Sequence, residues 1–358
     1  YGKNKKALIL DLDNTLWEGV IGDDGPEGIE IGEETSLGQA YREFQSYIKM
    51  HKDIGILLAI NSKNDLENAV SGLTHPDGLL RPEDFQVIKA NWNNKDANIR
   101  EIAQELNLGA DSFVFVDDNI VERDIVKKGT QGVAVPEIVT VESYITTIDK
   151  AGYFEIIELS KEDIVRNQMY KVNVERKTAQ KEFFDYTEYL LSLEMIADIK
   201  TFESIYVSRI AQLTNKTNQF NLTTKRFSQS EIELIMADDL TIKVSGRLRD
   251  KFGDNGVTSL VIGTIEDTIM NIELWLMSCR VLKRNMEFAM MDALVEEALE
   301  KGIKTIKGYY IKTAKNQMVK EFYGSMGFKL IGQEGENTIW QLELEAYQSL
   351  NKVIQVNV

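Results

Sequence analysis

The first 150 residues alternate short apolar runs with amphipathic helical patterns, and this alternation limits the possible folds more than any other feature. The runs are ALIL, GILLAI, FQVI, SFVFV and GVAV, and the helical patterns are LGQAYREFQSYIKMHKD, DLENAVSGL and KDANIREIAQELN. Nearly continuous apolar runs are typical of strands that are buried on both faces of a parallel sheet. Strands that alternate with helices form βαβ units. We therefore predict an α/β domain with a doubly wound parallel sheet.

The pattern changes after about residue 150. Residues from about 155 to 195 are helical in pattern, highly charged and rich in Tyr and Phe, and the strands beyond them are longer and more alternating. Examples are GVTSLVIGTIED and TIMNIELWLMS, and the helix NMEFAMMDALVEEALEKG follows them. We predict three segments: the α/β domain over residues 1–150, a helical linker over 151–195, and an α+β domain over 196–358.

Composition limits the partners and the location. The formal net charge of −16 repels phosphate groups, so we expect no nucleic acid and no anionic membrane as a partner. No apolar run approaches about 18 residues, and the first one ends at Asp11, so we expect neither a membrane helix nor a signal peptide. The single cysteine, Cys279, cannot form an internal disulfide, which favours a reducing, cytoplasmic location.

Polar side chains stand where the predicted strands end. They are Asp11 and Asp13 after the first run, Asn61 and Ser62 after the second, Lys95 at the start of the third helical pattern, and Asp117 and Asp118 after SFVFV. In an open parallel sheet, ligands bind outside the carboxyl ends of the strands, so these side chains are expected to gather there. Taken singly, the Asp-x-Asp pair is typical of a solvated turn and Asp-Asp-Asn of a helix N-cap. Their combination in this order instead favours a site.

Carboxylates, a hydroxyl and an ammonium group together suit phosphoryl transfer. One carboxylate can attack phosphorus, and a second one two residues later can protonate the leaving oxygen and then activate water. Mg²⁺ takes oxygen ligands, which the pair Asp117–Asp118 helps to supply. Ser62 and Lys95 would hold the phosphoryl oxygens by a hydrogen bond and by charge.

These segments resemble the motifs of the haloacid dehalogenase (HAD) superfamily over residues 5–148. DLDNTLW is similar to its first motif, NSKND to the second, Lys95 to the third and VFVDDN to the fourth. The resemblance implies Asp11 as the nucleophile and Asp13 as the general acid/base. It also implies that the phosphate-binding residues lie in and beside these motifs, and we include Ser62, Lys95, Thr15 and Asn61 among them.

The same resemblance implies a Mg²⁺ site. Its ligands would be Asp11, the backbone carbonyl of Asp13 and Asp118, with Asp117 nearby. Thr15 either supports this site or caps the local turn. Only a Gly-rich segment and one helical pattern separate the first two motifs, so we expect a HAD-like fold without a large cap.

The second half resembles the GNAT acyltransferase fold. WLMSCRVLKRNMEFAMMDALVEEA places a strand, a basic turn and a long helix in succession, and such a turn can bind a pyrophosphate at the helix N-terminus. The usual glycine-containing loop is here the run from Arg280 to Asn285, with both small positions replaced. Arg280, Lys283 and Arg284 either attract the phosphate of a carrier arm or form a solvated helix start.

A HAD half followed by a GNAT-like half resembles the FkbH-like family. QLTNKTNQFNLTTKRFS, GRLRDKFGDNGV and WLMSCRVL extend the resemblance over nearly the whole chain. It implies removal of phosphate from an acyl phosphate such as D-1,3-bisphosphoglycerate. It also implies delivery of the glyceryl unit to an acyl carrier protein through a thioester on Cys279.

Three alternatives stay open at this point. Cys279 is equally well explained as a small buried apolar residue. The protein could be a plain HAD phosphatase that acts on a small phosphorylated metabolite. The second half could also be a non-catalytic module that binds a carrier or coenzyme A.

Overall fold

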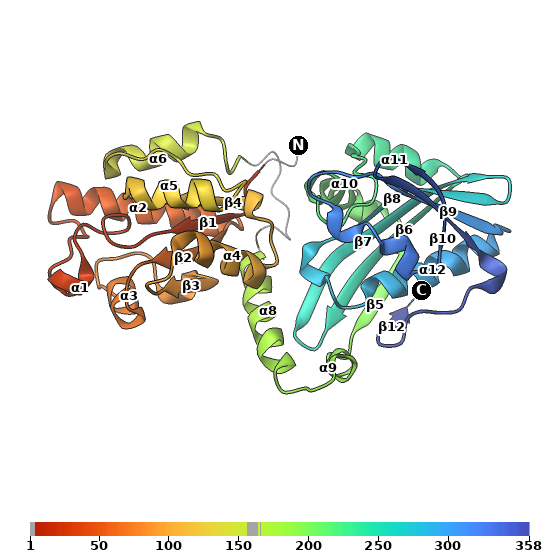
Figure 1. Cartoon of the computed structure of the whole chain (residues 1–358), viewed down its shortest axis with the longest axis horizontal. Coiled ribbons are helices and arrows are strands. Elements are labelled where there is room, and N and C mark those ends of the chain that lie inside the picture. The colour runs from red at the N-terminus through yellow and green to blue at the C-terminus, as the bar shows by residue number, and fades with distance from the viewer. Residues whose placement is uncertain (1–3, 156–163, 165, 358) are drawn as a thin grey trace. The chain divides into compact units, whose positions relative to one another are not determined.

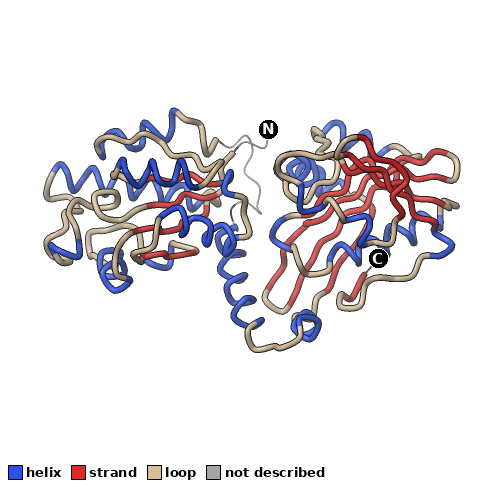
Figure 2. Tube along the Cα trace, in the orientation of Figure 1, coloured by secondary structure: helices blue, strands red, loops and turns tan. Residues whose placement is uncertain are grey.

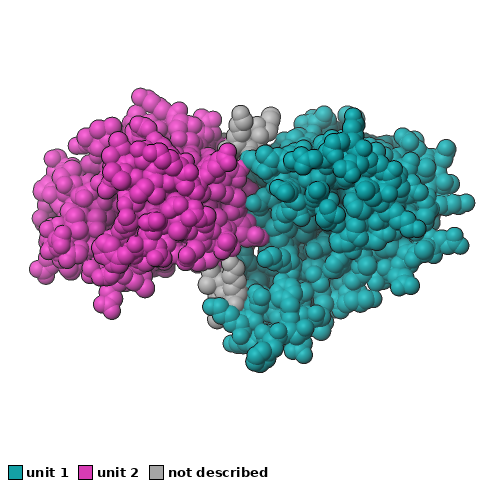
Figure 3. Space-filling model, viewed as in Figure 1, with its two compact units in different colours: residues 1–2, 172–358 teal, residues 3–171 magenta. Residues whose placement is uncertain are grey.

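The computed structural model describes residues 4–155, 164 and 166–357. The chain divides between Lys171 and Val172 into two compact units, coloured separately in Figure 3. We call them the N-terminal unit and the C-terminal unit. The division falls inside the segment that was predicted as a linker, and the boundaries at residues 150 and 195 stay a prediction.

The N-terminal unit is built on a four-stranded parallel sheet in the order β3-β2-β1-β4 (Figures 1 and 2). The strands are β1 Ala7–Leu10, β2 Leu57–Ser62, β3 Val87–Ala90 and β4 Phe113–Val116. Every residue of β1, β2 and β4 is buried, which explains the nearly continuous apolar runs in the sequence. The predicted α/β fold with a parallel sheet is confirmed.

The expected strand GVAV does not form. Its Ala134 makes only an isolated parallel bridge to Val114 of β4. Pro136, which follows two residues later, has no N–H to donate to a ladder. The sheet therefore ends at β4.

Helices cover both faces of this sheet (Figure 1). They are α1 Ile21–Asp24, α2 Ser36–Asp53, α3 Leu66–Leu73, α4 Lys95–Leu106, α5 Ile120–Gly129 and α6 Val141–Lys150. Helix α2 packs against α6, and α4 packs against α5. With this strand order, right-handed crossovers place α2 and α4 on opposite faces. Between β1 and β2 the chain forms only α1 and α2, so there is no large cap, as predicted.

The C-terminal unit contains an eight-stranded mixed sheet in the order β10-β11-β9-β8-β7-β6-β5-β12. The strands are β5 Ile196–Thr201, β6 Thr241–Asp250, β7 Gly253–Glu266, β8 Ile269–Met277, β9 Thr305–Tyr310, β10 Lys329–Glu334, β11 Asn337–Glu343 and β12 Gln355–Asn357. The pairs β8–β9 and β5–β12 are parallel, and the other pairs are antiparallel. A mixed sheet with segregated helices confirms the predicted α+β class.

Two hydrophobic clusters in this unit draw on alternate residues of the same strands. Its helices are α9 Tyr186–Ser192, α10 Val207–Lys216, α11 Gln229–Ala237, α12 Met286–Glu300 and α13 Phe322–Ser325, and α8 Arg166–Gln180 crosses the division between the units. Leu260 and Ile262 of β7 belong to the cluster with α10, whereas Val261 belongs to the cluster with α12. This alternation is the reason for the period of two in the strand sequences.

In the described part of the chain, no helix combines the length and the apolarity needed to cross a bilayer.

Candidate active site at the carboxyl ends of β1 and β4

The site forms where β1 and β4 lie side by side. In the sheet, β2 is the neighbour of β1 on one side and β4 is its neighbour on the other side. The chain runs outward from β1 through β2 to β3 and then returns past β1 to β4, so the strand order reverses at β1. Such a switch point opens a crevice at the carboxyl ends of the strands. The N–H of Asp11 donates to the carbonyl of Val116 at 3.0 Å, which continues the ladder by one bond and sets Asp11 beside the loop after β4.

The turn after β1 is held tightly. The carbonyl of Leu12 accepts a hydrogen bond from the N–H of Thr15 at 3.0 Å. Asn14 has a φ of +53°, a left-handed conformation that asparagine tolerates better than most residues. The hydroxyls of Tyr41 and Tyr144 both donate to the carbonyl of Asn14 at 3.2 Å. These bonds fix the turn that carries the two aspartates of the first motif.

Lys95 brings two carboxylates together. Its Nζ lies 2.7 Å from Oδ2 of Asp11 and 2.6 Å from Oδ2 of Asp117. Lys95 is 2 % exposed, Asp11 7 % and Asp117 0 %. Burial by itself lowers the pKa of a lysine, but the charges of Asp11 and Asp117 outweigh it and raise the pKa of Lys95 above its ordinary value. Lys95 therefore remains charged and holds the nucleophile candidate in place.

The loop after β4 is ordered by its own hydrogen bonds. Oδ1 of Asp117 accepts from the N–H of Asn119 at 2.9 Å. Burial, followed by the charge of Asp11, raises the pKa of Asp117 to about 7. The guanidinium of Arg123 donates to the carbonyl oxygens of Asp117 at 2.6 Å and Asp118 at 2.7 Å. Arg123 thus fixes the backbone that presents Asp118.

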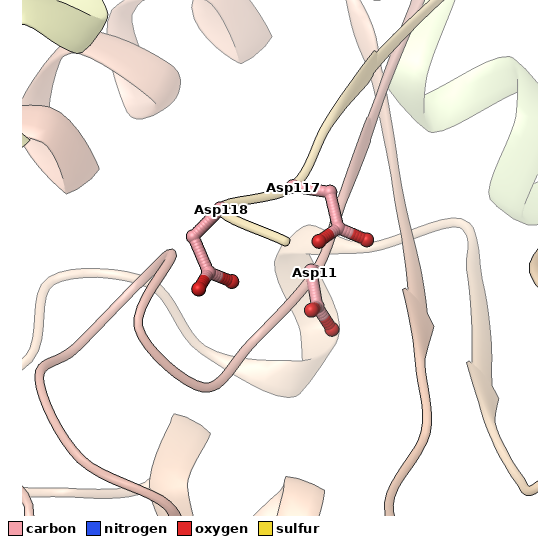
Figure 4. A group of neighbouring side chains, drawn as sticks. All are labelled: Asp11, Asp117 and Asp118. Atoms are coloured by element: carbon pink, nitrogen blue, oxygen red, sulfur yellow. The ribbon is translucent and has the colours of Figure 1, made fainter. Parts of the chain in front are cut away.

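Three carboxylates fit a divalent cation. Asp11, Asp117 and Asp118 each offer an oxygen, and these oxygens lie within 4.8 Å of one another (Figure 4). Oδ1 of Asp11 is buried and has no hydrogen-bond partner among the described residues. A buried carboxylate oxygen in that state is costly unless a cation or a donor approaches it. Asp117 already uses both oxygens within the protein, so Asp11 and Asp118 are the better candidates for direct ligands.

Asp13 has a different environment from Asp11. Its Oδ1 accepts from Nε1 of Trp17 at 3.0 Å and from the N–H of Ile21 at 3.1 Å, and its Oδ2 accepts from Nδ2 of Asn64 at 2.9 Å. Burial nevertheless raises the pKa of Asp13. A carboxyl group that holds its proton more readily suits a general acid. The metal contact expected through its backbone carbonyl stays a prediction.

The other residues predicted to bind phosphate, Ser62 and Asn61, differ in their contacts. Ser62 is the last residue of β2 and is buried at the carboxyl end of that strand. Asn61 instead donates from Nδ2 to the carbonyl of Lys95 at 2.9 Å and accepts from Asn98 at 3.0 Å. These bonds give Asn61 a structural task at the start of α4, and its contact with phosphate stays a prediction.

Thr15 contacts the loop after β4. Its Oγ1 accepts from the N–H of Asp118 at 3.2 Å and lies 3.4 Å from Oδ1 of the same residue. This contact joins two loops that are 103 residues apart in the chain. Of the two roles open to Thr15, the placement favours support of the site.

Three residues of the site were not singled out from the sequence. Arg123 carries no motif of its own, and Trp17 and Asn64 stand inside quoted segments without an assigned role. Asn64 is 51 residues away from Asp13. No local pattern signals such a contact, because it exists only once β1 and β2 are paired.

The Cys279 segment of the C-terminal unit is partly exposed. Cys279 opens a short 3₁₀ turn after β8 and is neither fully buried nor fully exposed. Nε of Arg280 donates to Oγ of Ser278 at 3.3 Å. Lys283 is exposed, has a φ of +66°, and accepts at its carbonyl a hydrogen bond of 2.6 Å from the hydroxyl of Tyr186. The roles predicted for Cys279, Arg280 and Lys283 stay predictions.

Arg284 lies in the interior of this unit. Its guanidinium donates to Asp250 at 3.0 Å, to Asn173 at 2.9 Å and to the carbonyl of Arg280 at 2.9 Å. Arg176 binds the same Asp250 through two nitrogens, at 2.8 and 2.7 Å. Burial, followed by the charge of Arg176, lowers the pKa of Arg284 to about 10. Because Arg284 is buried and engaged, its placement favours a structural task over the expected contact with a carrier.

Comparison with known proteins finds similarity among solved structures. No family model matches the chain, and no curated protein matches it significantly. The N-terminal part of the protein BF1531 from Bacteroides fragilis, which contains a phosphatase domain complexed with Mg, is 44 % identical. The alignment covers 44 % of this chain and 42 % of that one, with a TM-score of 0.43, so it spans less than half of the solved protein.

Acetyltransferases are also similar, at much lower identity. The ribosomal-protein-S18-alanine N-acetyltransferase from Escherichia coli is 12 % identical over 42 % of this chain and 94 % of its own, with a TM-score of 0.33. The PaiA N-acetyltransferase from Thermoplasma acidophilum, in complex with coenzyme A, is 13 % identical over 41 % and 98 %, with a TM-score of 0.30. These likenesses carry no argument about activity. By its sheets, the chain combines an α/β unit built on a parallel sheet with an α+β unit built on a mixed sheet.

Proposed function

We propose that the N-terminal unit is a Mg²⁺-dependent phosphatase that acts on a small phosphorylated metabolite. The observation that carries this proposal is the arrangement of Asp11. One of its oxygens is held by Lys95 at 2.7 Å, and the other is buried and left without a partner. Folding has fixed this carboxylate but has not used all of its hydrogen-bonding capacity.

The chemistry follows from the two aspartates of the turn. A carboxylate oxygen of Asp11 attacks phosphorus, the bond between phosphorus and the leaving oxygen breaks, and Asp13 gives its proton to that oxygen. Asp13 then takes a proton from water, whose oxygen attacks phosphorus, releases inorganic phosphate and restores Asp11. Lys95 and Ser62 would face the phosphoryl oxygens and stabilise their charge.

The carboxylates of the site account for the expected metal. Asp11 and Asp118 would hold Mg²⁺, with Asp117 orienting Lys95 beside it. When bound, Mg²⁺ supplies positive charge to the phosphoryl oxygens. The similar solved phosphatase domain, which is complexed with Mg, supports this assignment.

We further propose that the C-terminal unit receives an acyl group, such as the glyceryl group of D-1,3-bisphosphoglycerate. The thiolate of Cys279 would attack the acyl carbon, so that a carbon–sulfur bond forms and the carbon–oxygen bond to phosphate breaks. A thiol of an acyl carrier protein would then take the acyl group and restore Cys279. The partial exposure of Cys279 and the cations Arg280 and Lys283 in the same turn support this proposal.

Mass spectrometry of the full chain, incubated with Mg²⁺ and candidate acyl phosphates, tests both parts. We expect release of inorganic phosphate and a mass increase located on Cys279. Phosphate release without an adduct would reduce the function to that of a plain phosphatase. If neither phosphate nor adduct appears while a carrier still binds, the proposal is wrong and a binding module remains.

A further inference from the structure

An ion pair crosses the carboxyl end of β1. Lys63 directly follows β2, and Glu122 lies in the first turn of α5, which follows β4. Nζ of Lys63 is 2.6 Å from Oε1 of Glu122. Because β1 lies between β2 and β4 in the sheet, this pair spans the strand end that leads into Asp11. Lys63 and Glu122 therefore border the same site as the nucleophile candidate.

This pair differs from the buried pairs of Lys95. The side chain of Lys63 is 36 % exposed, whereas that of Lys95 is 2 % exposed. The described ion pairs join Lys63 to Glu122 and not to Asp11. Lys63 is thus a cation nearer to solvent, outside the group of charges that fixes the nucleophile.

Glu122 can hold Lys63 in more than one position. Its side chain is 11 % exposed, and its Oε2 is buried without a hydrogen-bond partner among the described residues. A buried acceptor without a donor costs free energy that folding alone does not recover. A lysine has three donors on a flexible stem, so Lys63 can turn while keeping one oxygen of Glu122.

The site holds more negative than positive charge. Three carboxylates lie around one buried cation, and these groups are Asp11, Asp117, Asp118 and Lys95. Asp13 is not counted because the proposed reaction needs its proton, and Arg123 is not counted because it donates to backbone carbonyl oxygens. A divalent cation balances the difference of two charges, so a phosphorylated substrate would then bring further uncompensated negative charge. An additional anionic group on that substrate would need another cation at the mouth of the site. Lys63 follows the carboxyl end of β2 and is more exposed than Lys95.

We propose that Lys63 determines specificity by binding a second anionic group of the substrate, separate from the phosphoryl group that Asp11 attacks. This group is a carboxylate or a second phosphate. Glu122 pairs with Lys63 and would not itself contact that group. The inference rests on the phosphatase function proposed above and deepens it, because it defines which phosphate esters the site prefers.

Two phosphate monoesters that differ in one group make the test. The carboxylate of 3-phosphoglycerate is replaced by a neutral hydroxymethyl group in glycerol 3-phosphate. Steady-state hydrolysis of each is measured with the full chain and Mg²⁺, for wild type, Lys63→Met, Lys63→Arg and Glu122→Gln. We expect Lys63→Met to lower kcat/KM about tenfold for 3-phosphoglycerate, mostly through KM, and less than twofold for glycerol 3-phosphate. Lys63→Arg should restore most of the loss.

Glu122→Gln is the matched control, because it breaks the same ion pair but keeps the cation. Its ratio of kcat/KM for the two esters should stay within about twofold of wild type. If Lys63→Met lowers kcat/KM equally for both esters, or changes it for neither, Lys63 does not bind the second anionic group and the inference is wrong. If Glu122→Gln reproduces the selective loss, the effect belongs to the ion pair and the inference is also wrong.

The failure of the phosphatase proposal is distinguishable from these results. If wild type hydrolyses neither ester, the proposed function fails for this substrate class, and the inference fails with it. If wild type releases phosphate and Asp11→Asn does not, the phosphatase stands. In that case the Lys63 variants alone decide the inference.

Discussion

Among the described residues, each unit contains a buried charged cluster, and these two clusters have opposite arrangements. In the N-terminal unit a single cation, Lys95, lies between Asp11 and Asp117. In the C-terminal unit a single carboxylate, Asp250, lies between Arg176 and Arg284. The first cluster thus has an excess of negative charge and the second an excess of positive charge.

The hydrogen bonds of the two clusters show which one keeps a carboxylate oxygen without a partner. Oδ1 of Asp250 accepts from Arg176 and from the N–H groups of Phe252 and Gly253. Its Oδ2 accepts from Arg176 and Arg284. Asp11 in contrast keeps one buried oxygen without a partner. A cluster whose hydrogen bonds are complete stabilises the fold, whereas an incomplete one is a candidate for chemistry.

The largest expected effect is on the cluster of Asp11. Asp11→Asn should lower kcat for phosphate release from a phosphate monoester at least about a thousandfold, because an amide is a poor nucleophile of the same size. Phosphate release is measured with and without Mg²⁺, and circular dichroism checks that the fold is kept. Activity within tenfold of wild type, with deamidation excluded by mass spectrometry, would remove Asp11 from the role of nucleophile.

The second prediction concerns the metal at the same cluster. Asp118→Ala should weaken Mg²⁺ binding at least about tenfold, because an ionic oxygen ligand is lost. Isothermal titration of the chain with Mg²⁺ measures the change. Asp124→Ala, at an exposed position of α5, is the control and should bind Mg²⁺ like wild type. Equal affinities for both variants would contradict the assignment of Asp118.

The third prediction tests the cluster of Asp250. Arg284→Met should lower the free energy of unfolding by about 2 kcal/mol, because the buried carboxylate of Asp250 loses one of its two guanidinium partners and the carbonyl of Arg280 loses a donor. The neighbouring Lys283→Met removes an exposed cation and should change stability by less than about 0.5 kcal/mol. Urea unfolding of both variants gives the comparison. A loss of carrier binding by Arg284→Met without a loss of stability would overturn the structural role of Arg284.

The smallest expected effect separates the chemistry of the two units. Cys279→Ala should leave phosphate release from a phosphate monoester within about twofold of wild type, because Cys279 belongs to the C-terminal unit and not to the proposed phosphatase site. The covalent acyl adduct and the transfer to a carrier should disappear. Mass spectrometry of the protein and a phosphate assay on the same samples measure both. Transfer at the wild-type rate would exclude Cys279 as the acceptor.

Local patterns predicted the elements well where burial alone decides them. The runs ALIL and SFVFV became β1 and β4 because every residue there is buried on both faces. The run GVAV is also apolar but forms only a bridge at Ala134, because Pro136 ends the pairing. In the second half, the longer strands β7 and β8 were predicted, whereas β5 and β12 were not singled out. Strand β12 pairs in parallel with β5 from the far end of the unit, and no local pattern reports such a pairing.

The sequence by itself determined which residues stand at the strand ends of the first half. A parallel sheet carries all of its strand ends to one edge, so Asp11, Lys95 and Asp117 could be expected to meet before any distance was known. That rule needs only the order of elements and the residue types at their ends.

The tertiary structure decided which of these groups have spare hydrogen-bonding capacity. It gave Asn61 and Arg284 bonds inside the fold, left one oxygen of Asp11 without a partner, and set Lys63 against Glu122 across the end of β1. Side-chain partners 50 to 100 residues apart depend on how strands pair and helices pack. Burial and pairing, and not residue type, therefore separate a structural charge from a functional one.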